Sequence, residues 1–338
     1  MMRSKDERGV ILVVVLVFAL LLVTSITTFQ RRAMLDSMVA RHRDSAAEAE
    51  AAARGGVRLA ITLLLEDRLQ EITGGLDSDS LTDAWARASG IELPAGDGVV
   101  LRLSVEDAGA RLNLNALIDG GKPRKYSELF LTQLLERVID DIPTGKSKAY
   151  DTADLAQNLL DYLDEDEVAI QGGLEDDAYQ RRDPPAKAQN RPLLSVDELR
   201  LVEGFDGPLV DALRPYVTVY PYARADGINP NTAPPYVLGL VFHGVGEDFR
   251  FASEDEVKSV LKAREGGELV CADDASNPAC AVKLQDVLPG EVFPPPTFTS
   301  RVFTIRAEAT VGEVRRTIEA VVDRGTPSQP QILAWRVR

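Results

Sequence analysis

An apolar, uncharged run at residues 10–29 follows a short charged opening at residues 1–9. An α-helix rises about 1.5 Å per residue, so roughly twenty residues reach across the ~30 Å hydrocarbon core of a bilayer. Ala, Glu, Arg and Leu then dominate residues 30–72 without a proline, which favours continuation of the same helix. Gly55-Gly56 is its weak point, and Thr73-Gly74-Gly75 supplies its stop. The pattern predicts a membrane anchor that continues as a long helix outside the membrane.

Beyond this helix, the periodicity changes from that of strands to that of helices and back. Alternating apolar and polar residues predict strands at residues 99–105, 111–115, 301–311, 314–323 and 332–337. Between the second and third of these, helical spacing separated by Pro, Gly and Asp predicts helices at residues 128–139, 151–163, 196–202, 208–213, 235–241 and 255–263. A helical body therefore interrupts a sheet.

Two short segments of the chain resemble each other, residues 112–116 and 228–233. Each contains two asparagines one residue apart and precedes a helical pattern. Asn side chains hydrogen-bond neighbouring backbone groups and cap helices. A turn that leads into a helix is a sufficient interpretation, so we assign no chemistry to these residues.

The charged opening allows two kinds of processing. A cleaved secretory signal ends at small residues, and residues 24–32 offer no good site. A glycine after a charged leader and directly before an apolar helix, here Gly9 before Val10, is how prepilin-like proteins begin. In those proteins the cut falls on the cytoplasmic side, so Gly9 would end the leader and Val10 would begin a mature chain that keeps its apolar helix.

The composition argues against several classes of function. With 338 residues, the chain has room for two or three domains beyond the anchor. Its formal charge of −15, from 53 acidic and 38 basic residues, argues against a nucleic-acid partner, because phosphate binding depends on Lys and Arg. With His42 and His243 as the only histidines, a His-based zinc site or a catalytic triad is not expected.

The only two cysteines, Cys271 and Cys280, flank a short loop. In an oxidising compartment, a disulfide between them would stabilise the fold by about 2–3 kcal/mol on the chain-entropy model, and two free thiols are the alternative. Asp273 and Asp274 within the loop are candidate ligands for a second ion. Basic residues on both sides of the apolar run leave its orientation open, but the expected disulfide and the prepilin-like start favour a chain whose bulk lies outside the inner membrane.

The strongest chemical signal is an acidic segment at residues 161–179, with eight carboxylates and no Lys or Arg. These charges repel one another unless a cation or protons neutralise them, and hard oxygen donors in a flexible loop suit Ca²⁺. Gly172-Gly173 would let the second group of acids fold back onto the first. The candidate calcium ligands are Asp164, Asp166, Glu175, Asp176 and, as a substitute, Asp177.

Other interpretations of the acidic segment stay open. An EF-hand does not fit, because Val168 and Ala169 stand where an oxygen ligand and a Gly are needed. Charged runs are commonly solvated loops, and paired carboxylates also suit a glycoside hydrolase, although no aromatic sugar-binding cleft is indicated nearby.

A separate unit at residues 194–208 looks like a DNA-gripping helix-hairpin-helix. Glu203 and Asp206 flank its turn and would repel phosphate, so we expect a packing role.

Several motifs in order resemble the K-type minor pseudopilins of type II secretion systems. They are Gly9 before the apolar helix, residues 106–115, 161–166, 173–179, 195–199 and 229–233, and the closing strands. The resemblance covers nearly the whole chain. It implies an α+β, pilin-like fold, in which a long membrane-spanning N-terminal helix packs on an antiparallel sheet. It also implies that a large all-α domain, SAM-like or helix-hairpin-helix-like, is inserted into this fold.

The expected division of the chain follows from this resemblance. It comprises a leader (1–9), a transmembrane part (10–30) and a periplasmic part (31–73) of the helix, a first pilin-like part (74–115), an inserted helical domain (116–296, with subdomains at about 116–215 and 226–296) and closing strands (297–338).

The resemblance also implies a function without catalysis. The protein would cap the tip of a periplasmic pseudopilus and help to initiate its assembly with I- and J-type minor pseudopilins, next to the major pseudopilin. Prepilin peptidase would cut after Gly9, and the new N-terminus at Val10 would be methylated. Similar proteins bind calcium in the inserted domain, which strengthens the expectation of a structural Ca²⁺. Secreted proteins and the secretin are further candidate partners.

Val14 would be the fifth residue of the mature chain, where most pilins carry a Glu. An unpaired carboxylate in a membrane is costly, so an apolar residue suits a subunit with no partner above it in the filament.

The second hypothesis is a bitopic inner-membrane envelope protein, whose calcium-binding periplasmic domain binds secreted proteins without joining a filament. An enzyme is the third. Only the first hypothesis requires a cut after Gly9.

Overall fold

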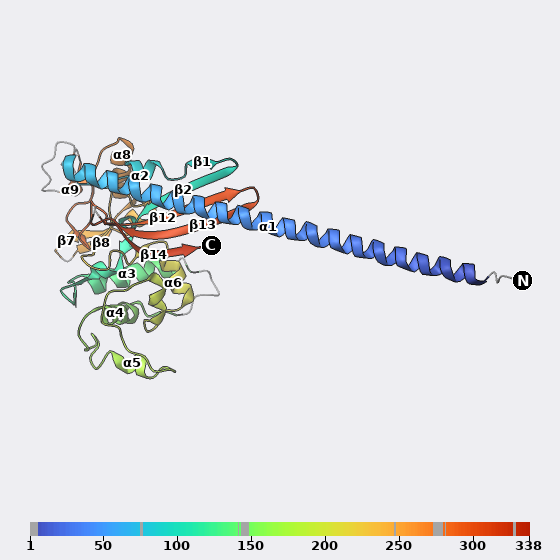
Figure 1. Ribbon diagram of the computed structural model, residues 1–338. Coiled ribbons are helices and arrows are strands. Elements are labelled where there is room, and N and C mark those ends of the chain that lie inside the picture. The colour runs from blue at the N-terminus through green and yellow to red at the C-terminus, as the bar shows by residue number, and fades with distance from the viewer. Residues whose placement is uncertain are drawn as a thin grey trace, which may run out of the picture.

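A single long helix packs its C-terminal half along one side of the body, and its N-terminal half extends far beyond the body (Figure 1). The computed structural model describes residues 6–74, 77–140, 142, 149–246, 248–272, 280, 282–326 and 329–338. The helix, α1 (Asp6–Gly74), is continuous, so Gly55-Gly56 does not interrupt it. An 18-residue window in its N-terminal part has a mean hydropathy of 2.8 and is 0% buried. The helix is therefore long and apolar enough to cross a membrane.

The main sheet has five strands in the order β1-β2-β12-β13-β14, and all neighbours are antiparallel. The strands are β1 (Glu92–Gly96), β2 (Val99–Asp107), β12 (Val302–Val311), β13 (Val314–Asp323) and β14 (Gln331–Val337). A short helix, α2 (Ala84–Arg87), precedes β1. Residues 108–301, here called the central region, therefore separate the two groups of strands in sequence, which confirms the prediction of an interrupted sheet.

The C-terminal half of α1 packs on one face of this sheet, over β2, β12 and β13 (Figure 1). Its fully buried residues follow helical spacing and are mostly small: Ala49, Ala53, Val57, Ala60 and Leu64. A Cβ on Gly56 would lie 2.8 Å from Leu101 Cδ1, whereas a Cβ on Gly55 would meet nothing within 4 Å. Gly56 thus allows a close approach of helix and sheet.

The central region contains helices and short strands. The helices are α3 (Ser127–Asp140), α4 (Thr152–Leu163), α5 (Asp176–Gln180), α6 (Gly207–Leu213), α7 (Pro235–Leu238), α8 (Glu254–Glu265) and α9 (Leu284–Val287), with 3-10 turns η1 (Ala108–Ala110), η2 (Leu114–Leu117) and η3 (Val196–Leu201). The strands are β3 (Leu112–Asn113), β4 (Ile118–Asp119), β5 (Lys122–Pro123), β6 (Val217–Thr218), β7 (Phe242–Val245), β8 (Asp248–Phe251), β9 (Val270–Cys271), β10 (Val282–Lys283) and β11 (Glu291–Phe293).

This composition differs from the all-α region that we expected. The three-stranded sheet β11-β7-β8 supplies phenylalanines to the core, and Phe130 of α3 lies 5.5 Å from Phe242 and 5.8 Å from Phe293 between ring centroids. Aromatic residues favour strands, and these strands are too short to show an alternating pattern in the sequence. The predicted strand at residues 111–115 is also shorter, because Asn113 Oδ1 accepts the N–H of Asn115 at 3.0 Å and begins the turn η2.

The two similar asparagine segments share a hydrogen-bonding pattern. In each, the second asparagine forms hydrogen bonds with both backbone groups of a distant residue. Asn115 pairs with Leu193 at 2.8 and 3.1 Å, and Asn231 pairs with Val270 at 2.8 and 2.9 Å. Both asparagines are buried. These residues therefore tie distant parts of the central region together, besides shaping local turns.

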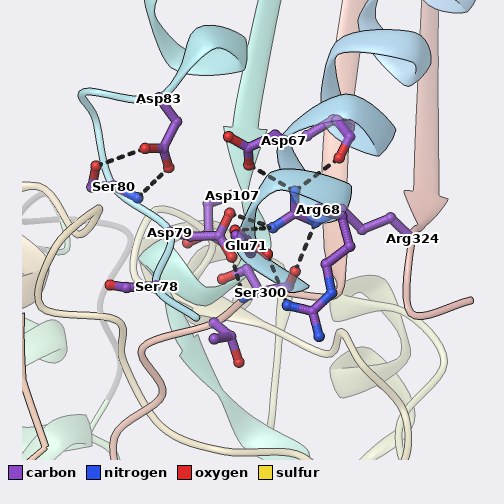
Figure 2. Close-up of polar contacts among 12 residues, drawn as sticks. Asp67, Arg68, Glu71, Ser78, Asp79, Ser80, Asp83, Asp107, Ser300 and Arg324 are labelled. Atoms are coloured by element: carbon purple, nitrogen blue, oxygen red, sulfur yellow. Dashed lines mark hydrogen bonds and ion pairs between the residues drawn. The ribbon is translucent and has the colours of Figure 1, made fainter. Parts of the chain in front are cut away.

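A buried arginine joins the end of α1, the segment after it and the end of β13 (Figure 2). Arg324 is 1% exposed. Its guanidinium donates to Asp67 Oδ2 at 2.9 Å, to Glu71 Oε1 at 3.2 Å, to the carboxylate of Asp79 and, through Nε, to the carbonyl of Ser300 at 3.1 Å. Burial raises the pKa of Asp79 well above its usual range, and Arg324 opposes this shift by stabilising the carboxylate.

The same junction holds the central region. Asp107 at the end of β2 accepts hydrogen bonds from Thr232 Oγ1 at 2.6 Å and from Asn229 Nδ2 at 3.3 Å. Asn229 Nδ2 also lies 3.2 Å from the carbonyl oxygen of Asp79, and the N–H of Ser300 donates to Asp79 Oδ2 at 2.6 Å. Buried polar contacts thus fix the central region against α1 and the sheet.

We expect Arg324→Met to lower the free energy of unfolding by about 3–5 kcal/mol, because it leaves buried carboxylates without their cation. Arg301→Gln is the control. It removes the more exposed ion pair with Asp323, 3.0 Å long, and should cost less than about 1 kcal/mol. Urea unfolding of the detergent-solubilised full chain measures both changes. Equal stability of the two variants would contradict the role assigned to the junction.

Candidate metal centre

The acidic segment runs from the last turn of α4 through a loop to α5. Asp151 caps α4, since its Oδ1 accepts the N–H groups of Ala153 and Asp154, both at 3.2 Å. The apolar face of α4 is buried in the main core, and this fixes the rotation of the helix. Asp161 and Asp164 are three residues apart at its end, so they lie on the same side.

The loop after α4 folds back on itself, as the sequence predicted. Val168 and Leu174 form an antiparallel bridge, and the N–H of Gly172 donates to the carbonyl of Ala169 at 2.7 Å. Gly172 and Gly173 have φ angles of 89° and 99°, which residues with a side chain rarely adopt. The turn brings Glu175 beside the end of α4.

Three carboxylates meet at this place: Asp161, Asp164 and Glu175. One oxygen from each lies within 4.8 Å of the others, and the residues are only 7%, 3% and 6% exposed. Asp164 Oδ1 and Glu175 Oε1 are buried and have no hydrogen-bond partner among the described residues. Asp161 accepts the N–H of Ile170 at 3.0 Å, and Glu175 Oε2 accepts a hydrogen bond from Asn190 Nδ2 at 3.0 Å. Buried oxygens without partners are costly, so Asp164 Oδ1 and Glu175 Oε1 lack a positive charge or a donor.

The pKa values of these three carboxyls also indicate that a positive charge is missing. Burial, followed by the nearby charge of Asp166, raises the pKa of Asp164 to about 7. Burial and the charge of Asp164 raise the pKa of Glu175 to about 7, and burial raises the pKa of Asp161 to about 6. Each carboxyl is therefore destabilised as an anion, and a cation between the oxygens would reverse this effect.

The spacing of the oxygens fits a calcium ion. Ca²⁺ binds oxygen at about 2.3–2.6 Å, so two ligands on opposite sides of the ion are roughly 5 Å apart. The group of Asp161, Asp164 and Glu175, spread over at most 4.8 Å, can surround one such ion. Ca²⁺ takes about six to eight oxygens, so bidentate carboxylates, backbone oxygens or water would complete the set.

A second group of three carboxylates provides a comparison. Asp67, Glu71 and Asp79 are equally close to one another, but Arg324 pairs with all three (Figure 2). In the described part of the chain, no Lys or Arg forms an ion pair with the group around Asp164. The group around Asp79 already receives a cation from the protein, whereas the group around Asp164 receives none from the described residues and is the candidate metal centre.

The other predicted ligands lie outside this centre. Asp166 is exposed, and its Oδ1 accepts the N–H of Val168 at 2.9 Å. Asp176 accepts the N–H of Ala188 at 3.0 Å and pairs with Lys187 at 3.3 Å, while Asp177 is exposed.

Asp161 is not among the ligands predicted from the sequence. Its spacing of three residues from Asp164 at the end of a predicted helix was the available signal.

The remaining predicted site residues lie elsewhere. Gly9 and Val10 belong to the first turns of α1, and residues 1–5 of the leader are outside the described residues. Cys271 and Cys280 are joined by a disulfide with a Cα–Cα distance of 5.7 Å. Asp273 and Asp274 between them also lie outside the described residues.

The unit that looks like a helix-hairpin-helix packs on α4. Its turn residue Gly204 has a φ of 85°, and a Cβ there would lie 2.7 Å from Leu155 Cδ2. Glu203 beside the turn pairs with Arg182 at 2.6 Å. The turn therefore faces α4, as expected for a packing role.

A family model described as type II secretion system (T2SS), protein K, matches residues 110–222. The type II secretion system protein K of Klebsiella pneumoniae is 30% identical, over 68% of this chain and 67% of the relative. That of Pseudomonas aeruginosa is 27% identical over 83% of this chain and 78% of the relative.

The fold is similar to that of a chain in the crystal structure of the GspK–GspI–GspJ complex from the type 2 secretion system of enterotoxigenic Escherichia coli. The TM-score is 0.57 and the identity 22%, and the match covers 89% of this chain and 99% of that chain. Sequence similarity along two thirds of the Klebsiella relative, together with this fold, leads to one conclusion: the chain belongs to the protein K family of type II secretion systems, the K-type minor pseudopilins.

Proposed function

We propose that this minor pseudopilin caps the tip of a periplasmic pseudopilus and helps to initiate its assembly. The observation that carries the proposal is the geometry of α1. Residues 11–44 are exposed on all sides of the helix, whereas the C-terminal half of α1 packs on the body (Figure 1). Exposed apolar helices need a membrane or companion helices. The wide body at the other end would obstruct a further subunit above it, which suits the end of a filament.

The proposed partners are I- and J-type minor pseudopilins, with the major pseudopilin below them. Membership of the family supports this assignment, as does the similarity to a chain from a GspK–GspI–GspJ complex. Val14 lies in the apolar part of α1, at the position where most pilins carry a Glu. A subunit at the end of the filament has no neighbour above it whose amine could pair with such a carboxylate, so an apolar residue is favourable there. In this proposal α1 is anchored in the inner membrane, the bulk lies in the periplasm, and secreted proteins or the secretin meet the tip.

The proposed cofactor is one structural Ca²⁺ held by Asp161, Asp164 and Glu175. Its support is the pair of buried oxygens without partners, on Asp164 and Glu175. The ion would supply positive charge, and the protein's part is to hold the loop against the end of α4. Calcium would thereby rigidify the side of the body that α4 and α5 form (Figure 1).

We expect calcium to stabilise the protein by about 2.7 kcal/mol at a concentration a hundredfold above its Kd. Asp164→Asn combined with Glu175→Gln should abolish binding, because the amides cannot neutralise the ion. Calorimetric titration and thermal unfolding of the full chain in detergent measure both effects. Asp177→Asn, at an exposed acid of the same loop, is the control and should bind normally. Undiminished binding by the double variant would contradict this ligand set.

The metal-free protein should lose stability as the pH rises. The folded-state pKa values of Asp164 and Glu175, both about 7, exceed those of unfolded carboxyls, about 4, so the folded state binds more protons between these values. In EDTA, the Tm should therefore be lower at about pH 7.5 than at about pH 5.5, and calcium should raise the Tm more at the higher pH. The double variant should show a smaller pH dependence. An identical pH dependence in both proteins would count against the raised pKa values.

Gly9→Ala should leave residues 1–9 attached and disable secretion, since the proposed peptidase cut follows Gly9. The N-terminal mass of the protein from its native membrane reports the cut directly. Gly55→Ala makes the same chemical change at a helix position where a Cβ meets nothing, and it should leave processing intact. Normal processing and secretion by Gly9→Ala would favour an envelope protein that binds secreted proteins without entering a filament.

A further inference from the structure

The main sheet protects one of its edges and leaves the other open. The edge strand β1 contains Pro94, and its register with β2 shifts between Pro94 and Gly96. Proline and bulges prevent an edge from pairing with another strand. β14 at the opposite edge contains no Pro and no Lys, and no described strand pairs with its outer side. After a shift near Val321, residues 334–338 run in regular register with β13; we call them the open edge.

The backbone of the open edge presents unpaired groups at alternate residues. The N–H of Arg338 donates to Thr317 O at 2.9 Å, and the N–H of Thr317 donates to Arg338 O at 3.0 Å. Successive residues of an antiparallel strand direct their backbone groups to alternate sides. Arg336 therefore also faces β13, whereas the N–H and C=O groups of Trp335 and Val337 point outward.

One face of the open edge is apolar and lies beyond the cover of α1. Trp335 is opposite Ala320 and Val337 is opposite Ile318 in the register. Ala320 and Ile318 are fully buried with α1, so Trp335 and Val337 point to the same face of the sheet. They are nevertheless 39% and 46% exposed, because α1 lies over β2, β12 and β13.

The other face of the open edge is basic. Arg336 and Arg338 alternate with the apolar residues, and both are exposed. Among the described residues neither forms an ion pair, although Glu319 is opposite Arg336 in the register. These arginines lie on a protein whose formal charge is −15, so they mark a place where an acidic segment meets less repulsion than elsewhere.

We propose that the open edge binds an extended segment of a second protein, in which apolar and acidic residues alternate. The segment adds a strand to β14 through the outward backbone groups of Trp335 and Val337. Its apolar side chains cover these two residues, and its acidic side chains reach Arg336 and Arg338. A second copy of this chain is disfavoured, because pairing two open edges would bring arginines of both copies together. The proposal does not depend on the tip role.

Photo-crosslinking in the native membrane tests this proposal. We expect the full chain with Trp335→p-benzoylphenylalanine to form one discrete adduct, and mass spectrometry should map it to an extended apolar and acidic segment of another protein. Ile91→p-benzoylphenylalanine places the same probe beside the protected edge, at a residue that is 49% exposed, and should give no discrete adduct. No adduct at Trp335, or an adduct only with a second copy or with lipid, would overturn the proposal.

Two variants separate strand addition from simple proximity. Val337→Pro removes an outward N–H without removing a bond to β13, which edge strands tolerate. Loss of one backbone hydrogen bond should weaken binding roughly three- to tenfold, with a matching loss of the Trp335 adduct. Arg336→Glu with Arg338→Glu should also reduce the adduct. Both variants should unfold at the wild-type temperature. An unchanged adduct in both would show that the contact does not use this edge.

Discussion

The arrangement of the whole body depends on one buried guanidinium. Arg324 at the end of β13 lies among Asp67, Glu71 and Asp79, which come from α1 and the segment after it. Burying such carboxylates is unfavourable without a cation, and burying the cation is unfavourable without the carboxylates, so each side requires the other. This mutual requirement holds the end of α1 to the last strands. Asp107 and Asn229 extend it to the central region.

The two groups of three carboxylates show how surroundings decide chemistry. Both groups are largely buried, and both have oxygens within 4.8 Å of one another. In one, the protein supplies Arg324. In the other, the described residues supply no cation, and oxygens of Asp164 and Glu175 lack partners. The first group is therefore a structural junction. The second has the oxygen donors and the charge deficit that suit a divalent cation.

The sheet links these features to a filament protein. Its one face carries α1, whose small residues and Gly56 allow close packing. β2 and β13 both end at the junction around Arg324, so the helix, the sheet and the central region are held together as one unit. A helix with half its length exposed needs neighbouring helices or a membrane. A sheet with one unprotected edge can also pair with one more strand. The molecule is thus equipped for contacts along α1 and, as we infer, along β14.

The sequence by itself determined the elements with a strong local pattern. The alternation in β13 predicted its bounds, Val314–Asp323, the spacing in α4 predicted a helix within one residue, and Gly172-Gly173 predicted the turn that brings Glu175 to Asp164. Local periodicity carries this information, because it reflects which face is buried. Only the tertiary structure decided the rest. Arg324 and Asp79 are 245 residues apart, and no local pattern marks their pairing. Asp161 lies in the candidate centre although it was not predicted there, and Asp176 lies outside it and pairs with Lys187. Tertiary packing decides which carboxylates lie close together and which lie beside a cation.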